Sequence, residues 1–153
     1  MTVIKQGFQD LVQDLGRDGY THIGISPTGA ADKVSMKIAN LFLGNHINDA
    51  VLEITLFGGT YLFDVPTTIC LSGSHFPAKI RGDEVPFNKP ITIQKGDILS
   101  IGGSISGARC YLAVQDGFNV ADLLGSSSTH LMSKSGGFRG RNLQKEDQLA
   151  YNK

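Results

Sequence analysis

The chain has 153 residues, of which 41% are hydrophobic and 18% charged, a length and composition that allow one domain with a buried core. Its 14 lysines and arginines balance 14 aspartates and glutamates, which excludes the strong single-sign field of proteins that bind nucleic acid or an anionic membrane through charge. The 19 glycines, spread between β-branched runs, indicate many tight turns and therefore a mainly β protein.

The N-terminal segment is predicted to hold a strand, an apolar patch and a long loop. The strand is expected at residues 2–4. Phe8, Leu11 and Val12 are spaced to pack on the core. The polar residues among them are expected to face solvent: Gln9, Asp10, Gln13 and Asp14. Residues 16–29 are rich in glycine and predict an irregular loop, and loops this long in a compact domain are usually functional.

One helix is predicted, over about residues 32–43. Asp32 is a good N-cap. The apolar residues that follow recur at i, i+4, i+7 and i+8, a stripe typical of a helix that packs on a core through that side: Val34, Ile38, Leu41 and Phe42. The pair Gly44-Asn45 supplies the residue types of a left-handed C-cap.

Short strands are predicted along most of the chain after this helix. The expected ranges are 51–56, 60–65, 67–72, 78–81, 84–87, 91–93, 98–101 and 108–114. Gly82-Asp83 is expected to turn one pair of them into a hairpin, through a type I turn with a bulge. Short strands at such regular spacing indicate a barrel or a sandwich, and the residues after 125 predict polar, glycine-rich loops.

The cysteines and the N-terminus point to a cytoplasmic protein. Cys70 and Cys110 lie in apolar, strand-like runs, which favours buried reduced thiols over a disulfide or a reactive nucleophile. The N-terminal residues lack an apolar stretch of signal-peptide length, and the sequence contains no candidate membrane span.

Nucleophilic and metal chemistry find little support in the sequence. The four histidines are scattered without the spacing of metal ligands, so surface or loop histidines are favoured over a metal site. Ser126, Ser128 and His130 invite a Ser-His interpretation. However, no Gly-x-Ser-x-Gly elbow surrounds them, and serine runs are common in loops.

The sequence supports anion binding and pairing between charged side chains better than it supports nucleophilic or metal chemistry. The segment 136–141 joins glycine turns to Arg139 and Arg141 and suits a carboxylate or phosphate, the alternative being a flexible loop with solvated arginines. The glycine clusters match neither a P-loop nor a dinucleotide fingerprint. Asp14 and Arg17 are open to a surface ion pair. Glu53 shares a strand face with Val51 and Thr55, so it is expected to be semi-buried and to need a partner.

Several of these residues also carry a family resemblance. The chain resembles the biotin-dependent carboxyltransferase family, known also as allophanate hydrolase subunit 2 and as the C subunit of 5-oxoprolinase, or KipA-type protein. The motifs that carry the resemblance are Val12-Gln13-Asp14-Leu15-Gly16-Arg17-x-Gly19, Gly29-Ala30-x-Asp32, Ala39-Asn40, Gly44-Asn45, Glu53-x-Thr55, Arg109-x-Tyr111-Leu112-Ala113, Leu124-Gly125-Ser126-x-Ser128-Thr129 and Gly136-Gly137-Phe138-x-Gly140-Arg141.

The resemblance implies a fold and two linked activities. The fold is a cyclophilin-like β-barrel over residues 1–153, matching the N-terminal half of family members, which are about twice this length and so hold one more domain. One activity is the ATP-dependent opening of 5-oxoproline to glutamate, with a KipI-type protein as the B subunit and a LamB/YcsF-type protein as the A subunit. The other is carboxyl transfer from carboxybiotin to urea or a similar amide. A third implied role is a non-catalytic regulatory module that binds a partner.

The resemblance also implies site residues. Fixed donors stabilise the oxyanion or carboxylate that develops when a small amide reacts. The residues assigned to catalysis are Asp14, Arg17 and Glu53. Those assigned to substrate or anion binding are Asp32, Asn40, Asn45, Ser126, Ser128, Thr129, Arg139 and Arg141. Ser127 stands where the family usually has arginine. We expect the chain alone to be inactive, to expose an apolar patch and to self-associate through it.

Overall fold

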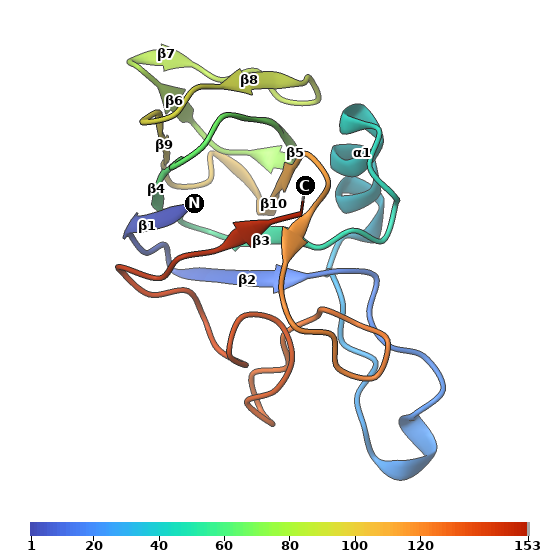
Figure 1. The fold of residues 1–153 in the computed structure, drawn as a ribbon. Helices are drawn as coiled ribbons and strands as arrows, with labels where there is room; N and C mark the ends of the chain where they lie inside the picture. Colours follow the sequence, from blue (N-terminus) through green and yellow to red (C-terminus); the bar gives the residue numbers. More distant parts are fainter. Residues whose placement is uncertain (153) are drawn as a thin grey trace.

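The computed structural model describes residues 1–152 and is mainly β with one α-helix (Figure 1). The helix is α1 (Lys33–Leu43), and a short 3₁₀ turn, η1, spans Thr21–Ile23. The strands are β1 (Thr2–Lys5), β2 (Gln9–Gln13), β3 (Val51–Thr55), β4 (Thr60–Leu62), β5 (Thr67–His75), β6 (Ala78–Ile80), β7 (Asp83–Glu84), β8 (Ile91–Ile93), β9 (Ile98–Ile101), β10 (Ser106–Val114), β11 (Phe118–Asn119) and β12 (Ala150–Tyr151).

The strands form two five-stranded antiparallel sheets and one two-stranded sheet. The orders are β1-β4-β9-β6-β7, β2-β3-β10-β5-β8 and β11-β12. The main core contains buried side chains from both large sheets, such as Leu52 and Leu112 from the second sheet and Tyr61 and Leu99 from the first. The mainly β class with one helix is thus confirmed. No ladder between described residues joins the two large sheets, so closure into a cyclophilin-like barrel stays a prediction.

Helix α1 begins and ends where the sequence predicted. The carboxylate of Asp32 accepts hydrogen bonds from the backbone N–H groups of Val34 and Ser35, at 3.1 and 3.0 Å. Gly44 ends the helix in the left-handed conformation, with φ at 72°. The helix covers the outer face of the second sheet, where Met36, Ala39 and Leu43 enter a second, smaller core cluster.

The face through which α1 packs differs from the prediction. Val34 and Leu41, expected to face the core, are 67% and 60% exposed, and Phe42 is exposed as well. Polar anchors at both ends of the helix select the opposite face. The N–H of Asp32 donates to the Tyr111 hydroxyl at 2.7 Å, and the Asn40 side chain donates to the Asp49 carbonyl at 2.9 Å. The prediction from the apolar stripe was wrong because it took no account of these anchors.

Residues 9–13 form strand β2 rather than a surface segment with one apolar side. Cover on both faces of the strand buries Asp10, Gln13 and the following Asp14, all of which were expected to face solvent. Phe8, expected in the core, is 66% exposed. Leu11 and Val12 are buried, as the sequence predicted. The prediction was wrong for Phe8, Asp10, Gln13 and Asp14 because it assumed one apolar side, whereas the strand is covered on both faces.

The hairpin at residues 80–83 exists, but its turn is of another type. Ile80 pairs with Asp83, which leaves a two-residue loop of Arg81 and Gly82. Both loop residues have positive φ, 55° and 92°. This is a type I′ turn, which matches the twist of an antiparallel pair better than the predicted type I turn does.

Two further expectations concern the cysteines and the membrane. Cys70 and Cys110 are buried and free, as the sequence predicted. Burial raises the pKa of the Cys70 thiol to about 11, which suppresses its thiolate. Within residues 1–152, no helix has both the length and the apolar character needed to cross a membrane.

Asp10 makes the stability of the fold depend on pH. Its carboxyl is 1% exposed, its Oδ2 accepts from the Gly7 N–H at 2.7 Å, and its Oδ1 has no partner among the described residues. Burial raises the pKa of Asp10 to about 6. The folded state therefore holds this proton more tightly than the unfolded state, so the contribution is fully present below about pH 4 and is lost as the pH rises through about 6.

We expect the free energy of unfolding of the wild type to fall by roughly 3 kcal/mol relative to Asp10→Asn between pH 4 and pH 8. Urea denaturation of both proteins at several pH values measures this difference. Asp18→Asn, an exposed change in the neighbouring loop, is the control and should follow the wild type. Parallel pH profiles for wild type and Asp10→Asn would contradict the assignment.

Candidate functional site

Loops that are far apart in the sequence meet at one end of the molecule. In Figure 1 the loop after β2 and the segments after β11 lie together below the sheets. Hydrogen bonds join them directly. The N–H of Thr129 donates to the Val12 carbonyl at 3.0 Å, and the Gln13 side chain donates to the Thr129 carbonyl at 3.3 Å. This loop end collects most of the residues that the family motifs singled out.

The carboxylate of Asp14 holds these loops together. Its Oδ1 accepts from the N–H of Gly16 at 2.7 Å and from the hydroxyl groups of Ser126 and Ser128. Its Oδ2 accepts from the N–H of Ser127 at 2.6 Å. We call these five residues the Asp14 cluster. A buried carboxylate with four donors is well satisfied, and it fixes the loop at 126–128 against the end of β2.

The glycine pair at 136–137 packs against this cluster from the other side. A Cβ on Gly136 would collide with the Ser128 carbonyl, and a Cβ on Gly137 would collide with the Thr129 side chain. Both residues also have positive φ, 67° and 52°. The glycines of this motif therefore allow close backbone approach, a reason that holds whether or not the segment binds an anion.

Arg17 lies beside the Asp14 cluster without pairing with it. The side chain is 2% exposed, its Nη2 donates to the Ser128 carbonyl at 2.8 Å and its Nε donates to the Leu123 carbonyl at 3.3 Å. None of the ion pairs among residues 1–152 includes Arg17. The surface pair of Asp14 and Arg17 considered from the sequence is thus absent, and the guanidinium is a buried cation held by carbonyl groups.

Arg17 lines a cavity of about 250 Å³. We call it the Arg17 pocket, and its lining residues are Arg17, Gly24, Ile25, Ser26, Leu123, Leu124, His130, Ser133 and Ser135. The Nδ1 of His130 is hydrogen-bonded to the Ser133 hydroxyl at 2.7 Å, and that hydroxyl to the Ser135 hydroxyl at 2.7 Å. Ser126 and Ser128 bond to Asp14 instead, so the structure does not pair them with His130.

Glu53 lies apart from the loop end, beneath the start of α1. It is 5% exposed and accepts from the N–H of Ala31 at 2.7 Å and from the Tyr111 hydroxyl at 2.8 Å. Its other oxygen lies 3.4 Å from the Nε of Arg109. The expected burial and need for a partner are confirmed. Through Tyr111, which also accepts from Asp32, Glu53 connects β3 and β10 to the helix.

Asn40 and Asn45 join the other end of α1 to the sheet. The Asn45 side chain donates to the Asn40 side chain at 3.0 Å and to the Val114 carbonyl at 2.8 Å, and it accepts from the N–H of Asp116 at 2.9 Å. The amide groups of both asparagines are thus used within the chain. Like Asp32 and Glu53, these residues are separate from the Arg17 pocket.

Arg139 and Arg141 flank the ring of Phe138, at 5.2 and 5.6 Å from its centroid. Arg141 also forms a bidentate pair with Asp147, which lowers the pKa of that carboxyl. Arg139 is exposed and lines two hollows of about 460 and 510 Å³. Of the two arginines, only Arg139 is free of an acidic partner within residues 1–152.

One of these hollows adjoins the Arg17 pocket. The hollow of about 510 Å³ shares Leu123 and Ser135 with the wall of that pocket. Arg139 therefore lies near the loop end, outside the pocket itself.

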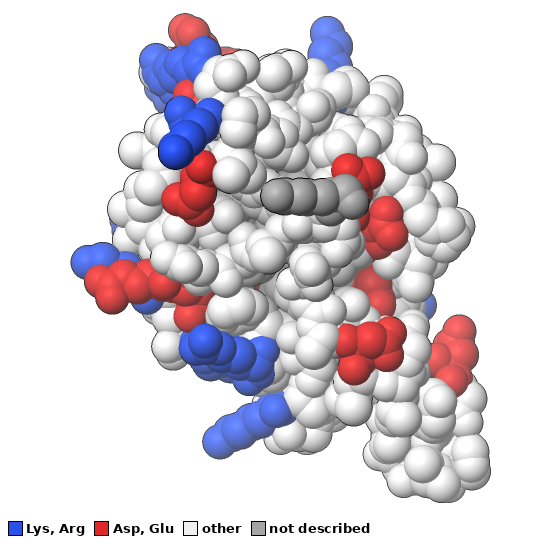
Figure 2. All heavy atoms as spheres, viewed as in Figure 1, with Lys and Arg blue, Asp and Glu red and all other residues white. Residues whose placement is uncertain are grey.

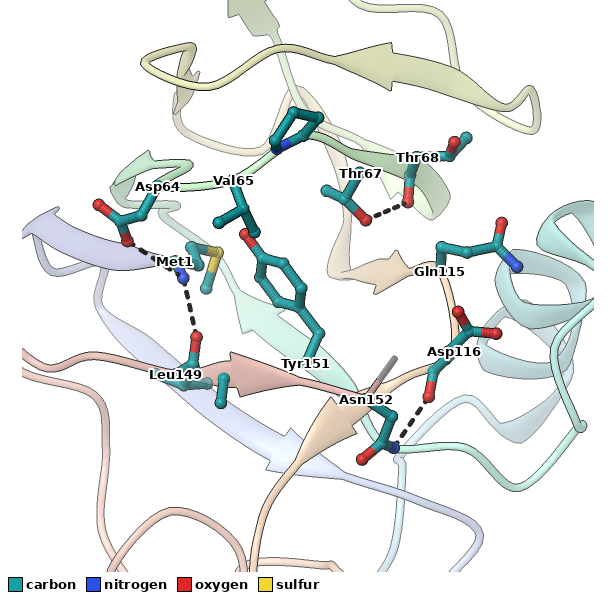
Figure 3. A pocket seen from close by; sticks show the side chains of 12 residues that line it. Met1, Asp64, Val65, Thr67, Thr68, Gln115, Asp116, Leu149, Tyr151 and Asn152 are labelled. Atoms are coloured by element: carbon teal, nitrogen blue, oxygen red, sulfur yellow. Dashed lines mark hydrogen bonds and ion pairs between the residues drawn. The ribbon is translucent and has the colours of Figure 1, made fainter.

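A larger cavity lies elsewhere, near both chain ends. It measures about 580 Å³ and contains none of the predicted site residues. Figure 3 shows Tyr151 crossing it toward Val65, with Asp64 and Asp116 on opposite sides. Its walls are largely apolar. Asp64 is already engaged by the Thr2 hydroxyl at 2.9 Å, so this cavity offers little chemistry of its own.

The charges on the face seen in Figure 2 do not mark a further site. Figure 2 shows Lys and Arg side chains and Asp and Glu side chains distributed over the same face of the molecule. Within residues 1–152, no group of three or more His, Cys, Asp or Glu side chains is placed to hold a metal ion. The candidate site is therefore defined here by the Asp14 cluster and the Arg17 pocket.

The sequence missed several residues of this region. Ser133 and Ser135 line the pocket, and Tyr111 and Arg109 hold Glu53, but none was a predicted site residue. The motif Arg109-x-Tyr111 was visible in the sequence and marked the second pair. Nothing in the sequence marked the serines, since their place in the pocket depends on the folding of the loop at 130–135.

Comparisons with known proteins agree on one family. The family model described as "Carboxyltransferase domain, subdomain A and B" matches residues 23–153. The chain is 39% identical over 151 residues to urea amidolyase from Lachancea kluyveri and covers 8% of it. It is 36% identical over 153 residues to the C subunit of 5-oxoprolinase from Escherichia coli strain K12 and covers 49% of it.

A solved structure gives the same relationship. The chain superposes on the Kluyveromyces lactis urea carboxylase with a TM-score of 0.97 and 39% identity, over 99% of this chain and 14% of that one. The fold is therefore that of a carboxyltransferase domain. The chain spans about half the length of its bacterial 5-oxoprolinase relative and a small part of the fungal proteins.

Removal of the Asp14 carboxylate should loosen the loop end. In Asp14→Ala, four donors lose their acceptor in a buried place, and we expect a loss of about 3–5 kcal/mol in the free energy of unfolding. Urea denaturation measures it. Asp18→Ala, exposed in the same loop, should stay within about 0.5 kcal/mol of the wild type. Equal stability of both variants would show that the Asp14 cluster does not hold the fold.

Proposed function

Because this chain belongs to the carboxyltransferase domain, subdomain A and B, family, we propose that it is one lobe of a cytoplasmic, ATP-dependent 5-oxoprolinase that opens 5-oxoproline to glutamate. The lobe acts together with a KipI-type B subunit and a LamB/YcsF-type A subunit. Since the chain spans 49% of its 5-oxoprolinase relative, the catalytic cleft also needs residues that correspond to the other half. The chain alone is inactive in this proposal.

The observation that carries the proposal is the Arg17 pocket, a small cavity with a buried cation and, among the described residues, no acidic lining residue. A reaction at an amide develops negative charge on oxygen, and fixed donors in a partly desolvated site stabilise it better than water does. Arg17, held by two carbonyl groups, is a fixed cation that attracts and positions an anionic substrate at the pocket. Ser133 and His130 add polar groups on the pocket wall.

The carboxylates take supporting roles in this proposal. All the hydrogen bonds that Asp14 accepts come from the two loops that form the pocket region. Glu53 is likewise engaged by Ala31, Tyr111 and Arg109. Groups so engaged position their neighbours, and we assign both as positioning residues rather than as acids or bases that meet substrate.

ATP is assigned to a partner protein of the complex. The sequence holds no P-loop, and the glycine pair at 136–137 is already packed against Ser128 and Thr129. These residues do not form a free cradle of backbone N–H groups for a nucleoside triphosphate. In the proposed reaction, ATP therefore does not bind to this lobe.

A second candidate is carboxyl transfer to urea or a similar amide. The urea amidolyase relative and the urea carboxylase structure, both at 39% identity, favour it. Carboxybiotin would then be a co-substrate that supplies the carboxyl group. A third candidate is a regulatory module that binds a KipI-type partner without catalysis.

The outward face of α1 supports the need for a partner in all three cases. Ile38, Leu41 and Phe42 line a shallow apolar hollow of about 270 Å³ on this face, next to the exposed Val34. A continuous apolar stripe on an exposed helix is typical of an interaction surface.

The decisive experiment is reconstitution with the KipI-type and LamB/YcsF-type subunits, followed by an assay of ATP-dependent glutamate release from 5-oxoproline. We expect release to need all components and to drop at least about 100-fold in Arg17→Gln, because the substrate then loses the cation that positions it. Arg81→Gln, an arginine with an exposed side chain in the hairpin at 80–83, is the matched control.

Other outcomes select the other candidates. Transfer of a carboxyl group from carboxybiotin to urea, with no glutamate release, would replace the first proposal by the second. A stable complex that turns over neither substrate would favour the third candidate, a regulatory module without catalysis.

Self-association should depend on the outward face of α1. At high concentration we expect the isolated chain to form a dimer or larger species in sedimentation velocity, and Leu41→Ser with Phe42→Ser to weaken it at least about tenfold, since each change removes apolar area from the contact. The exposed pair Lys95→Ser and Glu84→Ser is the control. A chain that stays monomeric throughout would refute this expectation.

A further inference from the structure

The charge of Arg17 has no counterion in the described part of the chain. Its side chain is 2% exposed, and a buried cation is costly unless an anion compensates it. The nearby Asp14 carboxylate accepts hydrogen bonds from four other donors. Carbonyl groups satisfy the geometry of Nε and Nη2 but contribute only partial charge.

The third nitrogen of the guanidinium is available to a ligand. Nη1 makes no hydrogen bond within residues 1–152, and it is not one of the enclosed atoms that lack a partner, so solvent reaches it. Arg17 lines the pocket of about 250 Å³, and that pocket is the open space beside it. Arg17 thus brings to the wall of this cavity a cation whose Nη1 makes no hydrogen bond with the described residues.

The rest of the pocket suits an uncharged remainder of a small molecule. Among the described residues that line it none is acidic, and Ile25, Leu123 and Leu124 supply apolar wall. The linked side chains of His130, Ser133 and Ser135 supply donors and acceptors. A volume of about 250 Å³ corresponds to on the order of eight water molecules, room for a compact ring with one acid group.

We propose that the Arg17 pocket binds small monocarboxylic acids that carry an amide or lactam group, with Nη1 donating to the carboxylate. The two free N–H groups of Nη1 match a single negative charge, whereas a phosphate dianion needs further positive partners. The lactam part of this proposal rests on the proposed function, because 5-oxoproline is a monocarboxylic acid that carries a lactam. The preference for a carboxylate rests on the pocket alone. Urea has no carboxylate and is therefore expected to bind more weakly.

The test is direct binding to the chain alone, so that it does not depend on turnover. Chemical shifts of the backbone amides and of the Arg17 side chain are followed by NMR during titration with 5-oxoproline, with 2-pyrrolidinone, which is the same ring without the carboxylate, with urea and with inorganic phosphate. We expect 5-oxoproline to shift signals of Gly24, Ser26 and Ser135, and 2-pyrrolidinone and urea to bind at least about tenfold more weakly.

Two variants complete the test. Arg17→Gln should weaken 5-oxoproline binding at least about tenfold, and Arg81→Gln should leave it unchanged. Because Arg17→Gln also loses two hydrogen bonds to the loop, the comparison of 5-oxoproline with 2-pyrrolidinone on the wild-type chain gives the same answer without a mutation.

Several results would overturn the proposal. They are equal binding of 5-oxoproline and 2-pyrrolidinone, stronger binding of inorganic phosphate, shifts confined to the cavity beside Tyr151, or no binding of 5-oxoproline at tens of millimolar. Carboxylate binding at this pocket together with a failure of glutamate release in the reconstituted complex would keep the pocket assignment and reject only the proposed enzyme.

Discussion

The loop end of this protein depends on one buried carboxylate. Asp14 follows directly after β2, and the three serines that donate to it lie more than a hundred residues further along the chain. A buried carboxylate without donors would be strongly unfavourable, so the two loops are stable only when they meet. The close approach of the glycines at 136–137 to Ser128 and Thr129 then follows from that meeting.

The position of Arg17 is a consequence of the same arrangement. Once Ser128 is bonded to Asp14, its carbonyl faces the guanidinium, and the Leu123 carbonyl completes the support. Asp14 is thereby kept from neutralising Arg17 in direct contact. Ser128 thus contacts both the Asp14 carboxylate, which has all its donors, and the Arg17 guanidinium, which has no counterion among the described residues. This arrangement leaves the cation available to a ligand.

The helix side of the second sheet is built on a different polar group. Glu53 ties β3, β10 and the start of α1 together, and the two asparagines fix the other end of the helix. These anchors hold small and apolar residues of α1 on the sheet and leave its more hydrophobic stripe outside. The chain thereby keeps an apolar surface that it does not cover itself.

The sequence alone determined what depends on neighbours along the chain. The ends of α1 follow from Asp32 and Gly44, and most strands follow from apolar runs broken by turn residues. The burial of Glu53 was predicted from the apolar residues around it, and all five residues of β3 are buried. The family was also visible, because a resemblance rests on residue types and their order along the chain and does not require knowledge of their contacts.

The tertiary structure decided what depends on contacts between distant segments. Only the sheet shows that residues 9–13 form a strand with Asp10 buried, and only the polar anchors show which face of α1 packs. Only the meeting of two loops shows that Asp14 bonds to serines and not to Arg17. The physical reason is common to all three. Burial and charge pairing are set by what lies across a contact, and spacing along the chain does not specify that partner.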